Sequence, residues 1–394
     1  MKPDPVPMPA QDAVLEAYAA GLAAVDPTVL VRKAVRQGYL DDWLFPPGTK
    51  REEPKQLHVL ALGKAAPRML WGLVEAGVPF KGLGVAPKGV QAPNVDTFRW
   101  LPGDHPVPGP ASFAAGREVM AWIDALPADA PVLVLLSGGA SACVEAPLGV
   151  SDEELRDRWR AWLGSGMAIE PMNRERARLS ALKGGRLGER LLRRTARARV
   201  WLLADTVREQ ASAAVGSGPF HVAGRNDTIP HRVLAGTDEL VVAAGLRLAS
   251  LGYQVHRHGA RIDGAAPLAV DGFLSAARGL SGSRIALVGG GEANVAVPPA
   301  APKGGRCQES ALLAARWLAQ AHDAQTVFAC LASDGIDGST DAAGAVVTGA
   351  DGDAEAAGAL ADHDAHHLLD RRGRLVHMGA TGTNVNDLWI ALRP

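Results

Sequence analysis

A Lys-Gly-Gly-Arg tetrad occurs twice in the chain, each time directly before a segment with the pattern of a helix. The two copies are residues 183–186, before LGERLLRR, and residues 303–306, before CQESALLAARWLAQ. Each copy sets two cations beside glycine backbone at a helix N-terminus, where unpaired N–H groups and the positive end of the dipole attract anions. These residues therefore suit a phosphate or a carboxylate, and a basic loop on a solvated surface is the alternative.

Six short apolar segments predict the strands that must position such residues. They are residues 58–62, 83–86, 132–136, 200–204, 284–288 and 327–332. Amphipathic stretches alternate with them, which is typical of βα units and of a largely parallel sheet. Ligands of open α/β sheets gather at the carboxyl ends of the strands, so the residues that follow these segments are the candidates for chemistry.

The first and third of these segments end in residues that suit phosphate. Lys64 follows the first segment, where a lysine could pair with phosphate oxygens or lie on the surface with its amine in water. The third segment ends in small residues whose N–H and hydroxyl groups form a plausible anion nest, or else a tight turn that packs a helix onto the sheet. These residues are Ser137, Gly138, Gly139, Ala140 and Ser141.

Three later strand ends each offer a carboxylate. Asp205, Glu292 and Asp334 follow the fourth, fifth and sixth segments. A carboxylate at a strand end can hold Mg²⁺, orient a hydroxyl group or cap the next helix, and for any one of them capping is the simplest reading. Three carboxylates together with a lysine and two arginine-bearing glycine turns are the groups that phosphoryl transfer requires.

The length of the chain predicts two domains. At 394 residues the chain exceeds the usual size of a single core. The polar stretch NDTIPHRVLAGT, residues 226–237, reads as a linker, and a fresh helix and strand pattern follows it. We therefore expect one domain over residues 1–235 and a second over residues 236–394.

Composition excludes several classes of partner. The formal net charge is −1, from 41 basic and 42 acidic residues, which predicts no nucleic-acid surface. The three cysteines show no CxxC pairing and favour a reducing compartment. The first residues lack the layout of a signal peptide, and no apolar run reaches the length of a membrane span. We expect a cytoplasmic protein with no membrane partner.

Several ordered motifs carry a family resemblance that spans nearly the whole chain. The chain resembles the glycerate 2-kinase family, in which a Rossmann-like N-terminal domain precedes a MOFRL C-terminal domain. The motifs are NRERARLSALKGGRL at 173–187, LLAD at 202–205, GSGP at 216–219, KGGR at 303–306, SDGIDGSTDAAGAVV at 333–347 and TGTNVND at 381–387.

The resemblance implies two α/β domains with mainly parallel sheets and an active site in the cleft between them. It implies ATP- and Mg²⁺-dependent phosphorylation of D-glycerate to 2-phospho-D-glycerate, with a homodimer as the candidate assembly. The family's active-site lysine, arginine and aspartate fall on Lys64, Arg306 and Asp205, and the candidate metal ligands are Asp205, Glu292 and Asp334. The candidate substrate or phosphate ligands are Ser137, Gly138, Gly139, Ala140, Ser141, Asn173, Arg176, Lys183, Gly304, Gly305 and Asn384.

Departures from the family pattern leave the substrate open. Ala140 stands where the family usually has glycine, Cys307 replaces an asparagine, and residues 204–210 read ADTVREQ in place of an acidic turn. A related hydroxy acid, longer than glycerate by one carbon, is therefore an alternative substrate. A binding protein without turnover is a second alternative, and a hydroxypyruvate reductase a third, although the chain has no G-x-G-x-x-G fingerprint for NAD(P)H.

Two further side chains carry expectations of their own. His105 lies in the turn Gly103-Asp104-His105-Pro106, which is similar to a turn of the family, and is a weak site candidate. Cys307 follows Arg306 at a helix N-terminus, which predicts a lowered thiol pKa. The histidines at 363, 366 and 367 are expected to lie on a solvated helix face.

Overall fold

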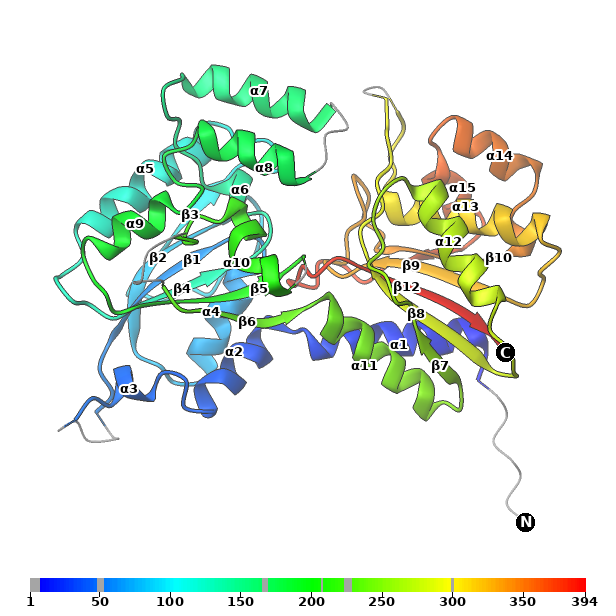
Figure 1. Ribbon diagram of the computed structural model, residues 1–394, viewed down its shortest axis with the longest axis horizontal. Coiled ribbons are helices and arrows are strands. Elements are labelled where there is room, and N and C mark those ends of the chain that lie inside the picture. The colour runs from blue at the N-terminus through cyan, green and yellow to red at the C-terminus, as the bar shows by residue number, and fades with distance from the viewer. Residues whose placement is uncertain (1–7, 48–52, 165–168, 207, 223–228, 299–300) are drawn as a thin grey trace, which may run out of the picture. The chain divides into compact units, whose positions relative to one another are not determined.

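The computed structural model describes residues 8–47, 53–164, 169–206, 208–222, 229–298 and 301–394, which form two compact units. The parallel-sheet unit comprises residues 26–236 and 382–384. The mixed-sheet unit comprises residues 8–25, 237–381 and 385–394. The two α/β units agree with the expected fold class (Figure 1). The first helix joins the second unit, whereas the sequence placed it in the first domain.

The parallel-sheet unit is built on six strands in the order β3-β2-β1-β4-β5-β6, all of them paired in parallel. The strand β4 reads VLVLL and is buried throughout, as expected for a strand covered on both faces. The strands are β1 (Leu57–Leu62), β2 (Phe80–Pro87), β3 (Phe98–Gly103), β4 (Val132–Leu136), β5 (Ala198–Ala204) and β6 (His231–Gly236).

Helices cover both faces of this sheet. Figure 1 shows α2 and α4 on one face and α5, α6 and α9 on the other, where their apolar residues complete a core with the strands. The helices are α2 (Pro27–Arg36), α3 (Asp41–Leu44), α4 (Ala66–Glu75), α5 (Pro110–Asp124), α6 (Ala140–Cys143), α7 (Asp152–Gly164), α8 (Ile169–Arg178), α9 (Arg186–Leu192) and α10 (Ala211–Ala214), with 3₁₀ turns η1 (Arg208–Gln210) and η2 (Val215–Ser217).

The mixed-sheet unit has six strands in the order β11-β10-β9-β12-β8-β7. Only β7 and β8 pair in parallel, and the other neighbours are antiparallel, so the expectation of a mainly parallel sheet is wrong for this unit. The strands are β7 (Gln254–Arg257), β8 (Ile285–Gly291), β9 (Val327–Ala332), β10 (Gly344–Thr348), β11 (Leu375–Val376) and β12 (Asp387–Arg393). The antiparallel pairing follows from β12, which inserts between β8 and β9 in the opposite direction.

The helices of this unit also form two layers. Figure 1 shows α12 and α13 on one face of the sheet and α1 and α11 on the other. Phe273, Phe328 and Trp389 meet edge to face at the centre of the core beneath α12 and α13. The helices are α1 (Ala10–Ala24), α11 (Thr237–Ser250), α12 (Ala266–Arg278), α13 (Arg306–Gln320), α14 (Ala354–Ala361) and α15 (Ala365–Arg371), with a 3₁₀ turn η3 (Gly349–Asp351).

All six segments predicted as strands are strands, and they correspond to β1, β2, β4, β5, β8 and β9. The predicted linker is wrong in part, because residues 231–236 form β6 and pair with β5. Residues 226–228 of that linker lie outside the described residues.

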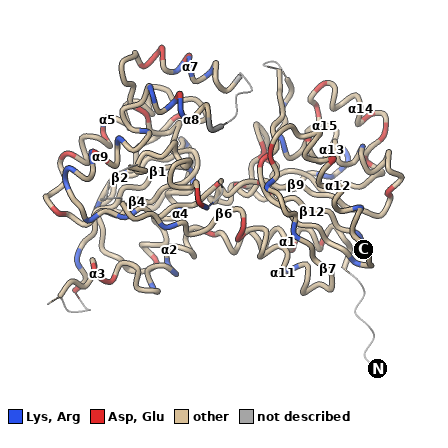
Figure 2. Tube along the Cα trace, viewed as in Figure 1, with Lys and Arg blue, Asp and Glu red and all other residues tan. Residues whose placement is uncertain are grey.

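Basic and acidic residues are distributed over the described parts of both units. Figure 2 shows Lys and Arg interspersed with Asp and Glu along both units. Within the part of the chain that the structure describes, no single helix is long and apolar enough to cross a membrane, and only α1 and α2 taken together across their bend reach that length and composition.

Candidate functional site

The strand order of the parallel-sheet unit has its switch point between β1 and β4, because the chain moves outward from these two strands in opposite directions. Ligands of doubly wound sheets bind outside the carboxyl ends of the strands at such a point. Lys64 follows β1, and Ser137, Gly138 and Gly139 follow β4, so both sequence candidates lie at the switch point.

The two strand ends are bonded to each other through their backbones. The Lys64 N–H donates to the Gly138 carbonyl at 2.9 Å, and the Ala65 N–H donates to Ser137 Oγ at 3.0 Å. Gly63 has a φ of +115°, and a Cβ there would lie 2.5 Å from Ser137 Oγ. Glycine is required at 63 by both its conformation and this close approach. The Lys64 backbone is thereby fixed against the turn after β4.

Two side chains lie over Gly139. A Cβ at this residue would lie 2.8 Å from Lys64 Cγ and 3.6 Å from His105 Cδ2, and its φ is +82°. Desolvation and the neighbouring Lys64 charge lower the pKa of His105, so its imidazole is neutral near pH 7. His105, the weak candidate from the sequence, therefore lies beside Lys64.

Two other candidates converge on Gly138. A Cβ at this residue would lie 2.5 Å from Asn384 Nδ2 and 2.8 Å from Asp205 Oδ2. Asp205 follows β5, the strand beside β4, and Asn384 belongs to the short segment 382–384 that joins this unit. The structure thus brings Lys64, Asp205 and Asn384 together around one glycine turn, although more than 300 residues separate the first from the last.

A chain of polar side chains extends from Ser141 on α6 toward α8. The hydroxyls of Ser141 and Ser217 are 2.8 Å apart, and Ser217 Oγ donates to Asn173 Oδ1 at 3.0 Å. Because the single proton of Ser217 is used in that bond, Ser141 is the donor to Ser217. Arg176 Nη1 also donates to Asn173 Oδ1, at 3.4 Å. Ala140 begins α6 and is buried beside this chain.

Lys183 is not accessible to a ligand. Its side chain is 1% exposed, and its Nζ donates to Glu145, whose side chain is fully buried. Ser180 Oγ donates to the other oxygen of the Glu145 carboxylate at 2.5 Å. The sequence expected Lys183 to bind phosphate, whereas its charge is neutralised inside the protein. The local sequence could not reveal Glu145, which lies 38 residues away.

Arg306, in the mixed-sheet unit, bonds two carboxylates. Its Nε and Nη2 donate to the two oxygens of Asp387 at 2.7 and 3.0 Å, and its Nη1 lies 2.6 Å from Glu292 Oε1. The side chain of Asp387 is 1% exposed, whereas that of Glu292 is 43% exposed. Although burial opposes it, the two carboxylates raise the pKa of Arg306. Glu292 is therefore the partner that a ligand could displace.

The start of α13 is capped by a carboxylate that the sequence did not single out. Asp337 accepts from the N–H groups of Cys307 and Gln308 at 3.0 and 2.9 Å, and from Gln308 Nε2 at 3.0 Å. A Cβ at Gly305 would lie 2.2 Å from Asp337 Cγ, so glycine is needed there for the cap to form. A Cβ at Gly304 would have more room, because the atom closest to it, the His363 carbonyl oxygen, would be 3.7 Å away. These first-turn donors are occupied by the protein itself.

Two other expectations for this region are wrong, the second of them in part. Burial raises the pKa of the Cys307 thiol well above its usual value, although a lowered one was expected. His363 and His366 are only part exposed, and their Nδ1 atoms contact Glu309 Oε2 at 3.1 Å and Gln308 Oε1 at 2.8 Å. His367 is exposed, as expected.

A magnesium cage is not prebuilt in the described residues. Their only group of three potential ligands within reach of one another is Cys307, Cys330 and Asp387. Both Asp387 oxygens already bond Arg306, and burial raises the pKa of both thiols, so this group does not suit Mg²⁺. Of the expected ligands, Glu292 bonds Arg306, Asp334 Oδ1 accepts from the Ile336 N–H at 3.1 Å, and Asp205 belongs to the other unit.

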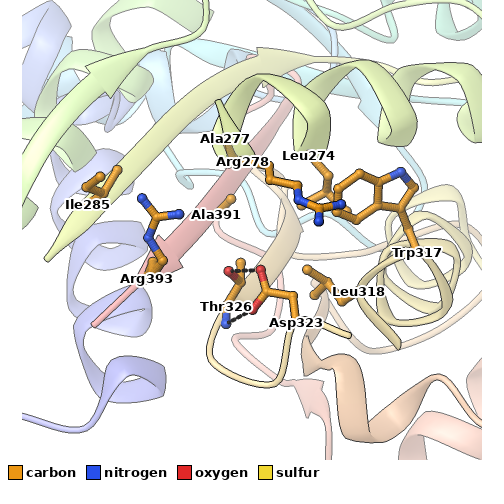
Figure 3. Close-up of a pocket in the computed structure, with 10 residues that line it drawn as sticks. All are labelled: Leu274, Ala277, Arg278, Ile285, Trp317, Leu318, Asp323, Thr326, Ala391 and Arg393. Carbon is orange, nitrogen blue, oxygen red and sulfur yellow. Dashed lines mark hydrogen bonds between the residues drawn. The ribbon is translucent and has the colours of Figure 1, made fainter. Parts of the chain in front are cut away.

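Figure 3 shows a pocket where β8 and β9 begin and β12 ends, whereas Arg306 contacts Asp387 at the start of β12. Three of its polar side chains, those of Asp323, Trp317 and Arg393, have partners in the protein. Asp323 bonds Thr326, Trp317 Nε1 donates to Asp271 at 2.8 Å, and Arg393 Nη2 donates to the Leu280 carbonyl at 2.7 Å. The pocket is lined by Leu274, Ala277, Arg278, Ile285, Trp317, Leu318, Asp323, Thr326, Ala391 and Arg393.

Sequence reasoning missed three polar residues that complete these clusters. Ser217 lies in the GSGP motif with a φ of +62°, which is unusual for a residue other than glycine. Asp387 ends the TGTNVND motif, and Asp337 lies within SDGIDGSTD. All three belong to segments that carried the family resemblance, and that was the only signal available for them.

Comparisons with known proteins agree with this architecture. A family described as "Domain of unknown function (DUF4147)" matches residues 13–238, and the MOFRL family matches residues 285–387. The D-glycerate 2-kinase of Thermotoga maritima is 33% identical, with 89% of this chain and 94% of the relative covered. The glycerate 2-kinase of Pyrococcus horikoshii is 27% identical, with 94% of each covered. The crystal structure of a glycerate kinase from Thermotoga maritima, 28% identical, matches with a TM-score of 0.77 over 98% of this chain and 99% of that one. The chain therefore belongs to the glycerate 2-kinase family.

Proposed function

We propose that this protein is an ATP-dependent kinase that phosphorylates the C2 hydroxyl of D-glycerate to give 2-phospho-D-glycerate. The observation that carries the proposal is the convergence of Lys64, Asp205 and Asn384 on the glycine turn after β4. Membership of the glycerate 2-kinase family supports the reaction class and the substrate. A kinase requires ATP as its phosphoryl donor.

The cluster around the glycine turn supplies groups that phosphoryl transfer needs. Lys64 would neutralise negative charge on the transferred group, and the polar groups of Ser137, Gly138 and Gly139 would orient it. Asp205 would accept the proton of the attacking hydroxyl, and Asn384, beside it, would hold that hydroxyl in place. Support for these roles comes from the position of Lys64 and the glycine turn at the switch point, with Asp205 and Asn384 beside Gly138.

Arg306 would bind a phosphate oxygen of the nucleotide in place of Glu292. With Asp387 and Glu292 its cluster carries a net negative charge, so a phosphate oxygen gains access only when Glu292 moves away. Half-exposed Glu292 can do this at little cost, whereas buried Asp387 keeps the guanidinium in position. Gly304 would let the ligand approach the backbone before α13, whereas Gly305 makes room for the Asp337 cap.

Magnesium would enter together with the nucleotide, because Mg²⁺ at kinase sites takes most of its ligands from phosphate oxygens and water. Asp205 is the candidate carboxylate of the parallel-sheet unit for its coordination, and Glu292 and Asp334 are the candidates of the mixed-sheet unit. When bound, the ion would neutralise charge on the phosphates.

Two alternatives make different predictions. A hydroxy acid longer by one carbon is favoured by no contact among the described residues, although Ala140 distinguishes this loop from the family pattern. A hydroxypyruvate reductase would need a dinucleotide fingerprint after β1, and the chain reads Gly63-Lys64-Ala65-Ala66 there.

The proposal is tested by incubating the purified protein with Mg-ATP and D-glycerate, measuring ADP, and identifying the product by phosphorus NMR. We expect ADP and 2-phospho-D-glycerate, and no consumption of NAD(P)H with hydroxypyruvate. Gly138→Ala should lower kcat by about 100-fold, because the new methyl displaces Asp205 and Asn384. Gly272→Ala, on α12 with open space around it, is the matched control and should leave kcat unchanged. A wild type that forms no ADP from small hydroxy acids contradicts the proposal.

A further inference from the structure

Arg176 is a buried cation without a carboxylate partner among the described residues. Arg176 is only 6% exposed, and its Nε has no hydrogen-bond partner among the described residues. Its single hydrogen bond, to Asn173 Oδ1 at 3.4 Å, is long for an N–H···O contact. The nearby Glu145 carboxylate is bonded by Lys183 and Ser180.

The charges around Arg176 do not balance. Glu145 and Lys183 neutralise each other, so Arg176 leaves one positive charge inside the protein. The guanidinium stacks on Trp159 at 3.9 Å from the ring centroid, which offsets only part of the cost of burial. Burial lowers the pKa of Arg176 to about 10, and the group therefore stays protonated at neutral pH. One negative charge would complete this environment.

The polar chain described above connects this cation with the glycine turn. Ser141, Ser217 and Asn173 lie between them in successive contacts of 2.8 and 3.0 Å. Ser141 follows Gly139, over which Lys64 lies, by two residues. These contacts therefore link Arg176 to the helix that begins directly after the glycine turn.

We propose that Arg176 and Asn173 form the subsite for the carboxylate of the substrate, so that the enzyme selects short 2-hydroxy acids with one negative charge. The planar guanidinium matches the geometry of a carboxylate, and the Asn173 amide nitrogen adds a second donor. A monoanion balances the single excess charge, whereas a doubly charged phosphate would reverse it. The inference rests on the proposed function for its substrate, but it concerns binding and not transfer.

A purely structural arginine in this unit looks different. Arg186, at the start of α9, donates through Nη1 to the carbonyls of Ala177, Ser180 and Lys183. Arg176 has an unpartnered nitrogen and no backbone carbonyl partner among the described residues. The contrast favours a ligand as the missing partner of Arg176.

Asn173→Asp tests the subsite without removing a buried group. The new carboxylate has the same shape as the amide and would pair with Arg176, so the melting temperature should stay the same or rise. The same pairing should exclude the substrate, so calorimetry without ATP should show a Kd for D-glycerate raised by about 100-fold or more. A variant that binds D-glycerate as tightly as the wild type overturns the proposal.

Arg176→Met and glycerol provide the second arm. Arg176→Met keeps the volume but not the charge and should raise the Kd for D-glycerate by a similar factor, while Arg176→Lys should raise it less. Wild type should bind glycerol, which lacks the carboxylate, at least about 100-fold more weakly than D-glycerate, and equal binding of the two overturns the subsite.

ADP formation with an unchanged Kd and KM in Asn173→Asp refutes the subsite alone. Binding of D-glycerate that depends on Arg176, without ADP formation, refutes the kinase alone.

Discussion

The two Lys-Gly-Gly-Arg tetrads share four residues but make opposite contacts. In the tetrad at 183–186, Lys183 is buried against Glu145, and Arg186 bonds backbone carbonyls at the end of α8. In the tetrad at 303–306, Lys303 is exposed, and Arg306 bonds Asp387 and Glu292. The first tetrad stabilises the fold, whereas the second presents a guanidinium beside a displaceable carboxylate.

The two tetrads also differ in the backbone conformation of their glycines. Gly184 and Gly185 both have positive φ, +59° and +84°, in the turn that joins α8 to α9. Gly305 has a φ of −158° and precedes α13 in an extended conformation, with Asp337 against it. The same four residues therefore take a different backbone conformation in each copy. In each copy a charged side chain of the tetrad contacts a residue that is distant in the chain, Glu145 in the first and Asp387 in the second.

The largest expected effect is on stability, in the first tetrad. Lys183→Met leaves the Glu145 carboxylate buried without its cation, and breaking a buried pair in this way costs about 3–5 kcal/mol. The free energy of unfolding, measured by urea denaturation with circular dichroism, should fall by this amount. Lys303→Met is the matched change in the second tetrad and should alter stability by less than about 0.5 kcal/mol, because Lys303 is exposed.

The double variant Lys183→Met with Glu145→Gln sharpens this result. Removal of both charges should recover most of the lost stability, because no unpaired charge is left inside. Equal losses for Lys183→Met and Lys303→Met would show that the two tetrads do not differ in the way described.

The strands with continuous apolar runs were predictable, because burial on both faces leaves a direct trace in the sequence. The strands β3, β6, β10, β11 and β12 were not predicted, and β6 was mistaken for a linker because it follows a polar stretch with Pro230. The direction of β12 determines the mixed character of the second sheet, and strand direction has no local signature.

The site residues that directly follow strands were predictable. Lys64, the glycine turn and Asp205 follow strands of one parallel sheet, so sheet geometry alone predicts their proximity. Asn384 was reached only through the family resemblance, because its segment joins this unit from a distant part of the sequence. The role of Lys183 could not be predicted, since burial beside Glu145 depends on tertiary packing.

The next effect in size is on turnover, in the second tetrad. Arg306→Lys keeps a cation beside buried Asp387, so the protein should remain folded, but the bidentate contact and its direction are lost. We expect kcat to fall by about 100-fold, measured as ADP formation, with a small change in melting temperature. Arg186→Lys is the matched change in the first tetrad, and kcat should stay within about twofold while stability falls by about 1–2 kcal/mol through lost carbonyl contacts. Equal kcat values for the two variants would contradict the assignment of Arg306.

The smallest expected effect concerns pH and the buried carboxylates beside the two tetrads. Glu145 has Lys183 as its cation, whereas burial raises the pKa of Asp337 from 3.8 to about 6 despite the N–H groups that it caps. The folded state therefore binds this proton more tightly than the unfolded state, and the resulting stability is lost as the pH rises through 6. Between pH 5 and pH 7 the free energy of unfolding of the wild type should fall by about 1 kcal/mol relative to Asp337→Asn.

Asp353→Asn gives the control of opposite sign for this pH dependence. A backbone hydrogen bond from Ala356, followed by the Arg372 contact, lowers the pKa of Asp353 at the exposed start of α14. The stability that comes from this lowered pKa is fully present above the unfolded value of 3.8 and is lost only at lower pH. The difference between wild type and Asp353→Asn should therefore be flat from pH 5 to pH 7. A flat profile for Asp337→Asn as well would contradict the raised pKa of Asp337. It would mean that the N–H donors at the start of α13 fully offset the cost of burying the Asp337 carboxylate.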